Sequence, residues 1–171
     1  MIDASTAGPI ARYLSEDHVR LERLLSASVA GAGFSREPFD AFRAGLLRHI
    51  ALEEKILFRA LREAGSDEAA LALLRRLRID HGALASLLVG TPASPLVAEI
   101  RIVLAPHNAL EDAPGGLYDR CDALLAARAA EILEQMRSYP PVKAAAYADG
   151  PRVLRTAHDA LAASARQHGI P

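Results

Sequence analysis

The stretch HIALE at residues 49–53 returns as HNALE at residues 107–111, so one pattern, a histidine followed four residues later by a glutamate, occurs twice. Each copy lies inside a long stretch of helix-forming residues. Positions four apart share one helix face, so each stretch directs an imidazole and a carboxylate the same way. The repeated pattern therefore predicts two helices that each carry a pair of metal-ligand side chains.

Two further histidines, His18 and His81, stand alone, one ahead of each pair. Both fall on the apolar stripe of an amphipathic stretch, where a buried side chain is expected. The chain thus contains, twice, a helix with one histidine followed by a helix with His-x-x-x-Glu. Four imidazoles and two carboxylates facing one interior predict a site for two metal ions, with these ligands: His18, His49, Glu53, His81, His107 and Glu111.

Glycine, proline and capping residues mark where the helices are expected to begin and end. The expected helices run from Pro9 to Gly31-Ala32-Gly33, from an N-cap at Ser35 to Gly65, from an N-cap at Ser66 to Gly90-Thr91-Pro92, and from Ser94-Pro95 to Pro114-Gly115-Gly116. Residues 117–138 are expected to continue the fourth helix, and a short helix is expected from Gly150-Pro151 to about Gln167. Because short connections make successive helices antiparallel neighbours, we predict an all-α, up-down-up-down four-helix bundle with an additional short C-terminal helix. Residues 1–171 are expected to form a single domain, with the bundle at about 9–138 and a C-terminal strap at about 139–171.

Composition excludes several classes of function. A net charge of −1 provides no field to attract nucleic acid or an anionic membrane. The single cysteine, Cys121, excludes an intrachain disulfide, a cysteine-rich zinc site and an iron–sulfur cluster. The segment from Met1 to Leu14 has no basic and apolar regions typical of a signal peptide, and no apolar run reaches the ~18 residues of a membrane helix. A cytoplasmic protein is expected.

The alternative to a metal site is ordinary burial. A lone histidine on an apolar stripe is usually a hydrogen-bonded core residue, and either His–Glu pair could be a buried ion pair. Two buried carboxylates are costly unless they are paired or bind metal, and two such pairs together with two aligned histidines favour metal. The acidic residues next to the ligands point about 100° away on their own helices and are expected to be solvated: Asp17, Glu54, Asp80 and Asp112. Tyr118, just after the break, could reach into the site, but a core or surface tyrosine is the preferred expectation. His158 and His168 are expected to be exposed.

The order and spacing of these ligands resemble those of the hemerythrin-like family, also called the HHE cation-binding domain. Ferritin-like proteins use Glu-x-x-His instead. The six proposed ligands match the family's ligand positions, and the stretch 53–58 (EEKILF) resembles the family's sequence at and just after its second-helix ligands. The resemblance covers roughly residues 9–138.

The resemblance implies two iron ions in a non-haem di-iron centre, with both carboxylates bridging them; zinc and manganese are alternatives, since imidazole and carboxylate suit these metals too. Oxygen carriers of the family have a second histidine one turn away on the third helix, where this chain has Leu77 and Ala85. One iron would therefore lack a protein nitrogen, which disfavours efficient oxygen carriage.

The expected function is the binding or sensing of a small diatomic or peroxide ligand: dioxygen, peroxide or nitric oxide. A di-iron enzyme such as a peroxidase, and an iron storage or sensing protein without gas chemistry, stay open as alternatives, with binding preferred to catalysis. The sequence predicts no nucleic-acid or membrane partner and leaves open whether the chain forms a homodimer.

Overall fold

The computed structural model describes residues 7–169, and over that range it is helical without strands, as the sequence predicts. Residues 1–6, part of the segment examined for a signal peptide, and residues 170–171, the end of the expected strap, lie outside the described residues. The helices are α1 (Pro9–Ala27), α2 (Arg36–Leu52), α3 (Phe58–Glu63), α4 (Glu68–Leu87), α5 (Ser94–Asp112), α6 (Leu117–Leu124), α7 (Ala129–Ser138) and α8 (Ala157–Gln167). A π-helical turn, η1 (Glu53–Leu57), joins α2 to α3, and a 3₁₀ turn, η2 (Ala126–Arg128), joins α6 to α7.

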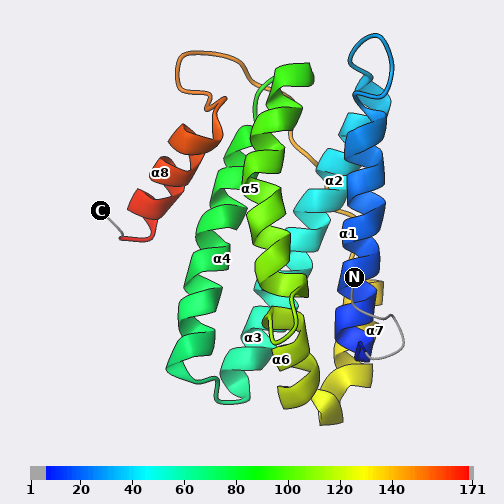
Figure 1. The fold of residues 1–171 in the computed structure, drawn as a ribbon, viewed down its shortest axis with the longest axis vertical. Coiled ribbons are helices and arrows are strands. Elements are labelled where there is room, and N and C mark those ends of the chain that lie inside the picture. The colour runs from blue at the N-terminus through cyan, green and yellow to red at the C-terminus, as the bar shows by residue number, and fades with distance from the viewer. Residues whose placement is uncertain (1–6, 170–171) are drawn as a thin grey trace.

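The four longest helices, α1, α2, α4 and α5, run along the long axis of the molecule (Figure 1). The closest packing among them is between α1 and α2 and between α4 and α5, and α1 also contacts α5. Each long helix therefore turns one face toward the same interior.

Two local expectations were wrong, a regular second helix and the N-cap of the third, although the second helix does end just before Gly65. The second helix does not continue regularly to Gly65, because the amide of Phe58 donates to the carbonyl of Glu53, five residues back. Such a π-helical turn carries one extra residue and has no propensity signal of its own. The N-cap of α4 is Asp67, not Ser66: the Asp67 carboxylate accepts a hydrogen bond from the Ala70 amide at 2.7 Å.

The C-terminal third also differs in detail from expectation. Residues 117–138 form α6, η2 and α7 instead of one extension of α5, and α7 packs against α1 and η1. The last helix begins at Ala157, after an N-cap at Thr156, and not at residues 150–151. It packs on α4 and α5, so the expected strap lies against the chain's own helices (Figure 1).

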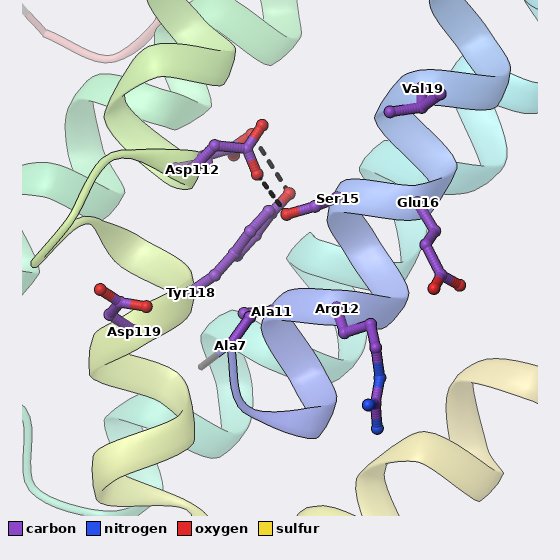
Figure 2. A pocket seen from close by; sticks show the side chains of 10 residues that line it. Ala7, Ala11, Arg12, Ser15, Glu16, Val19, Asp112, Tyr118 and Asp119 are labelled. Carbon is purple, nitrogen blue, oxygen red and sulfur yellow. Dashed lines mark hydrogen bonds between the residues drawn. The ribbon is translucent and has the colours of Figure 1, made fainter. Parts of the chain in front are cut away.

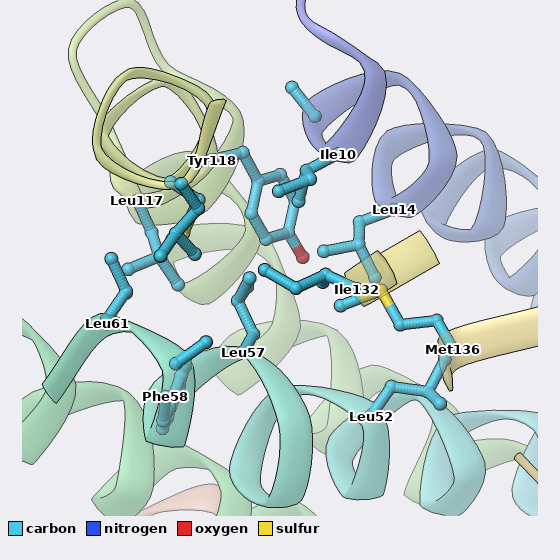
Figure 3. Close-up of a cluster of buried hydrophobic side chains, with 14 of the residues drawn as sticks. Ile10, Leu14, Leu52, Leu57, Phe58, Leu61, Leu117, Tyr118, Ile132 and Met136 are labelled. Atoms are coloured by element: carbon cyan, nitrogen blue, oxygen red, sulfur yellow. The ribbon is translucent and has the colours of Figure 1, made fainter. Parts of the chain in front are cut away.

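Buried apolar side chains form two clusters along the length of the molecule. The first cluster includes Leu14, Leu57 and the ring of Tyr118 (Figure 3), and the second includes Leu21 and Phe42. On α1, Leu14 belongs to the first cluster and Leu21 to the second, and the buried His18 lies between them. A polar layer thus separates the two apolar cores.

Candidate metal centre

The polar layer contains the six side chains that the sequence singled out. All six are buried, and His18, the most exposed of them, retains 7% of its surface. Their nitrogen and oxygen atoms form two overlapping groups, His18 with His49 and Glu111, and His81 with His107, Glu53 and Glu111. Within each group the atoms lie within 4.8 Å of one another. We call these the His18–His49 half and the His81–His107 half.

The two glutamates connect the halves. Glu53 turns Oε1 toward His49 Nε2, at 3.7 Å, and Oε2 toward His81 Nε2, at 3.1 Å. Glu111 Oε2 lies 3.4 Å from His18 Nε2 and 3.3 Å from His107 Nε2. The two histidines of the first half, His18 and His49, approach to 3.0 Å between their Nε2 atoms. Each carboxylate therefore faces one imidazole from each half.

Several of these atoms make no hydrogen bond to the described residues. His81 Nε2 and Glu53 Oε2 are close, but neither has a hydrogen-bond partner within residues 7–169, and Glu111 Oε1 has none there either. Buried polar atoms without a partner are costly. A cation between them would satisfy all three, and imidazole with carboxylate is a donor set that suits transition metals. The residues present therefore fit a metal ion.

The ring nitrogens that face away from the centre contact four carboxylates. Asp112 binds His18 Nδ1 at 2.8 Å, Asp17 binds His49 Nδ1 at 2.9 Å and Glu54 binds His81 Nδ1 at 2.9 Å. The fourth carboxylate, Asp80, lies 3.7 Å from His107 Nδ1, beyond hydrogen-bond distance. Such partners fix the tautomer and orientation of a metal-binding histidine.

The expectation that these four acidic residues are solvated was wrong. Each is adjacent to a proposed ligand on its own helix and therefore points sideways, but the neighbouring helix lies in that direction. The contacts consequently close a ring: Asp17 of α1 reaches α2, Glu54 of η1 reaches α4, Asp80 of α4 faces α5, and Asp112 of α5 reaches α1. The sequence signal for these contacts was that an acidic residue adjoins one ligand on each of the four ligand-bearing segments.

The ionisable side chains of the centre shift one another's pKa values. Burial opposes protonation of His49 and His81, but the nearby carboxylates outweigh it and raise both pKa values to about 9. Burial opposes ionisation of Glu53, yet these two histidines hold its pKa well below the usual value. Burial and the charge of Glu53 together raise the pKa of Glu111 well above its usual value. The pKa values of these carboxylates and imidazoles therefore depend on one another, and metal binding, which requires deprotonated ligands, would displace protons from them.

Tyr118 also enters the centre, contrary to the expectation of an ordinary core or surface tyrosine. Its ring packs in the first apolar cluster and is 1% exposed. Its hydroxyl donates to Glu53 Oε1 at 2.7 Å and lies 3.2 Å from Glu111 Oε2. It also lies 3.2 Å from His18 Nε2 and 3.3 Å from His49 Nε2. The sequence offered this position only as the less favoured alternative, because it depends on the break between α5 and α6.

That break is built on two glycines. Gly115 has a φ of +74°, in the left-handed region that favours glycine. A Cβ on Gly116 would meet the carbonyl oxygens of Ala113, Glu111 and Leu110 at 2.7–2.8 Å. Because backbone atoms cannot move away cheaply, the close turn requires glycine, and it places α6 so that Tyr118 faces the same interior as Glu111.

A cavity of about 280 Å³ reaches this part of the centre from the surface. Ser15 and Val19 of α1 line one side, and Asp112 and Tyr118 line the other (Figure 2). Glu111 also lines the cavity. Ser15 donates a hydrogen bond to Asp112 at 2.5 Å (Figure 2). The cavity is large enough for small molecules to approach the His18–His49 half.

The other candidate residues, His158, His168 and Cys121, do not belong to the cluster of six. His158 and His168 are exposed, as expected, in α8 and just after it. Cys121 is fully buried, and burial raises the pKa of its thiol. In the part of the chain that the structure describes, no helix is long and apolar enough to cross a membrane.

Comparison with known proteins supports the cation-binding interpretation. A family model described as the hemerythrin HHE cation binding domain matches residues 10–114, a range that holds all six clustered side chains. Searches among curated proteins and among solved structures gave no match. The matched range ends before α6, so Tyr118 lies outside it.

Proposed function

The chain belongs to the hemerythrin HHE cation-binding family, and from that premise we propose that it holds a non-haem di-iron centre that binds or senses dioxygen, peroxide or nitric oxide. The proposed ligands are His18 and His49 for one ion and His81 and His107 for the other, with Glu53 and Glu111 bridging the two. The observation that carries this proposal is the position of the Glu53 carboxylate between the two halves. One of its oxygens faces His49 and the other faces His81.

We also infer the topology that would hold this centre. The helices α1, α2 with α3, α4 and α5 form an up-down-up-down four-helix bundle within a single domain. Short connections between successive helices and the contacts of α1 with α2 and α5, and of α4 with α5, support this arrangement.

The surroundings favour a small exchangeable ligand over a purely structural ion. One turn either side of His81, α4 presents Leu77 and Ala85, which offer no donor atom. Two iron ions in this setting would supply open coordination positions and a redox-active metal. The chain itself buries the donors between two apolar clusters, orients three of the four imidazoles through carboxylates, and leaves a cavity beside the first half.

Elemental analysis of protein purified from cells grown without added metal tests the identity of the centre. We expect about two iron ions per chain, since near-octahedral ions each need several of the donors present. The double variant Glu53→Ala/Glu111→Ala is the matched control and should contain almost no iron. Two zinc ions in the parent would exclude the di-iron assignment while leaving cation binding intact.

Thermal unfolding with and without a chelator provides a second test. An ion present at a hundredfold excess over its dissociation constant stabilises the folded state by about 2.7 kcal/mol. Chelation should therefore lower the midpoint by roughly 5–10 °C in a chain of this size, and it should leave the double variant unchanged. Equal midpoints after confirmed loss of metal would contradict a buried centre.

Ligand addition separates binding from the alternatives. Azide or nitric oxide added to the iron-loaded protein should produce new absorption bands, because exchangeable positions are present. Sustained turnover of hydrogen peroxide would establish the enzymatic alternative instead. A spectrum indifferent to azide, nitric oxide and peroxide would favour iron storage or iron sensing without gas chemistry.

A further inference from the structure

We propose that Tyr118 is a seventh protein ligand of the centre, binding through its phenol oxygen the ion held by His18 and His49. This inference rests on the proposed di-iron centre and adds to it a residue of α6, outside the range that matches the family. It makes the two ion sites chemically different.

The first argument is the position of the oxygen. The phenol oxygen lies 2.7–3.3 Å from one donor atom of each of four clustered residues: His18, His49, Glu53 and Glu111. Ligand atoms about 2.1 Å from one ion, at right angles to each other, lie about 3 Å apart. The spacing is therefore that of adjacent ligands around a shared ion. Among the hydrogen bonds of residues 7–169, it is also the only oxygen from outside the six predicted ligands that contacts both imidazoles of this half.

The second argument is that the oxygen is held where it is. The ring lies among apolar side chains that include Ile10, Leu14, Leu57 and Ile132 (Figure 3). The glycine turn before α6 fixes the backbone two residues upstream, at Gly116. A side chain restrained at both ends loses little freedom when it binds an ion, as a pre-organised ligand should.

The third argument is chemical. A bound cation favours loss of the phenol proton. On binding, the O–H bond breaks, the proton is released to solvent, and the oxygen binds iron as a phenolate, a ligand that iron accepts from tyrosine in other proteins.

The consequence is an asymmetric centre. The His18–His49 ion would have two imidazoles, two shared carboxylates and a phenolate, whereas the His81–His107 ion would have two imidazoles and the shared carboxylates alone. The His81–His107 ion would then keep one exchangeable position more than the His18–His49 ion.

The test uses the absorption of the full-length protein loaded with iron(II) and oxidised in air. Phenolate bound to iron(III) absorbs visible light by charge transfer, and excitation in that band enhances tyrosinate ring vibrations in the Raman spectrum. We expect the band and the vibrations in the parent protein and their loss in Tyr118→Phe. Tyr13→Phe, which changes a half-buried tyrosine of α1 outside the centre, should retain both.

The outcomes separate this inference from the proposed function. A parent protein that binds two irons but shows no tyrosinate vibrations overturns the inference and leaves the di-iron centre standing. A band that survives in a folded Tyr118→Phe variant overturns it too. A parent that binds no iron overturns both proposals. If Tyr118→Phe does not fold, the Raman spectrum of the parent alone decides the question.

Discussion

The two halves of the centre derive from the same sequence pattern but have different surroundings. In the His18–His49 half, both outward nitrogens bind carboxylates at 2.8–2.9 Å, and the Tyr118 hydroxyl lies within 3.3 Å of both inward nitrogens. In the His81–His107 half, one outward nitrogen is bound, at 2.9 Å, and the other lies 3.7 Å from its carboxylate. Within the described chain, no tyrosine hydroxyl contacts the imidazoles of that half.

This difference shows which features of the centre the repeated motif determines and which it does not. The His-x-x-x-Glu spacing fixes which helix face carries the donors, so it produces the same local geometry twice. The surroundings of those donors depend on tertiary packing. The α5–α6 break returns the chain toward α1, and it therefore adds a phenol to one half only.

The largest loss of bound iron should come from changing a residue that both halves share. Glu53→Ala removes an oxygen from each half, so we expect iron content to fall from about two ions per chain to less than one, since a shared carboxylate serves both ions. Glu63→Ala, which alters an exposed carboxylate of α3, is the control and should bind as the parent does. If Glu53→Ala retained both ions at parental affinity, the halves would not be bridged by this residue.

Two single variants, each lacking one histidine of one half, should distinguish the two ion sites. His18→Ala and His107→Ala should each lower the iron content to about one ion per chain, because each removes a donor from one half only. If Tyr118 binds the first ion, only His18→Ala should also lose the visible phenolate band. The exposed His158 provides a control, His158→Ala, that should change neither quantity. Loss of the band in His107→Ala alone would place the tyrosine on the other ion.

A smaller effect is expected from the carboxylates behind the histidines. Asp17→Ala leaves the outward nitrogen of His49 without its partner, and loss of such a partner typically weakens metal binding by about 10–100-fold. Competition with a chelator of known affinity should show this loss for one of the two ions. Glu22→Ala, an exposed position on the same helix, should have no effect. Equal weakening of both ions would mean that Asp17 acts on the whole fold.

The smallest effect is expected at Asp80. It is buried but lies beyond hydrogen-bond distance of His107, so Asp80→Ala should weaken iron binding by less than about 10-fold, the lower end of the usual range for bound partners. The same chelator competition measures it. A loss as large as that of Asp17→Ala would show that the two halves are supported equally.

The sequence predicts the helices and the clustered donors because both depend on which residues follow one another over short stretches of chain. Glycines and prolines mark the ends of the long helices to within a few residues, and apolar periodicity places His18 and His81 on buried faces. The six donor side chains then meet in two overlapping groups in the interior.

The features that sequence reasoning missed depend on contacts between helices. The geometry of a single helix directs Asp17 and Asp112 toward solvent, yet each reaches a histidine of a neighbouring helix. Tyr118 lies beyond a helix break whose angle no periodicity specifies. The π-helical turn after His49 depends likewise on packing, because an isolated helix has no reason to widen there.

That turn has a consequence for chain length in related proteins. A π-helical turn accommodates one residue more than the α-helix it interrupts, and closing it while keeping every residue would rotate the downstream helix by about 100°. Phe58 and Leu61, both fully buried, would then leave the first apolar cluster. A relative with one residue fewer just after the position of Glu53 could run through the same place as an unbroken α-helix with the same core. Alignments of such chains should therefore open a one-residue gap within positions 54–57, while the spacing of the His-x-x-x-Glu pair stays constant.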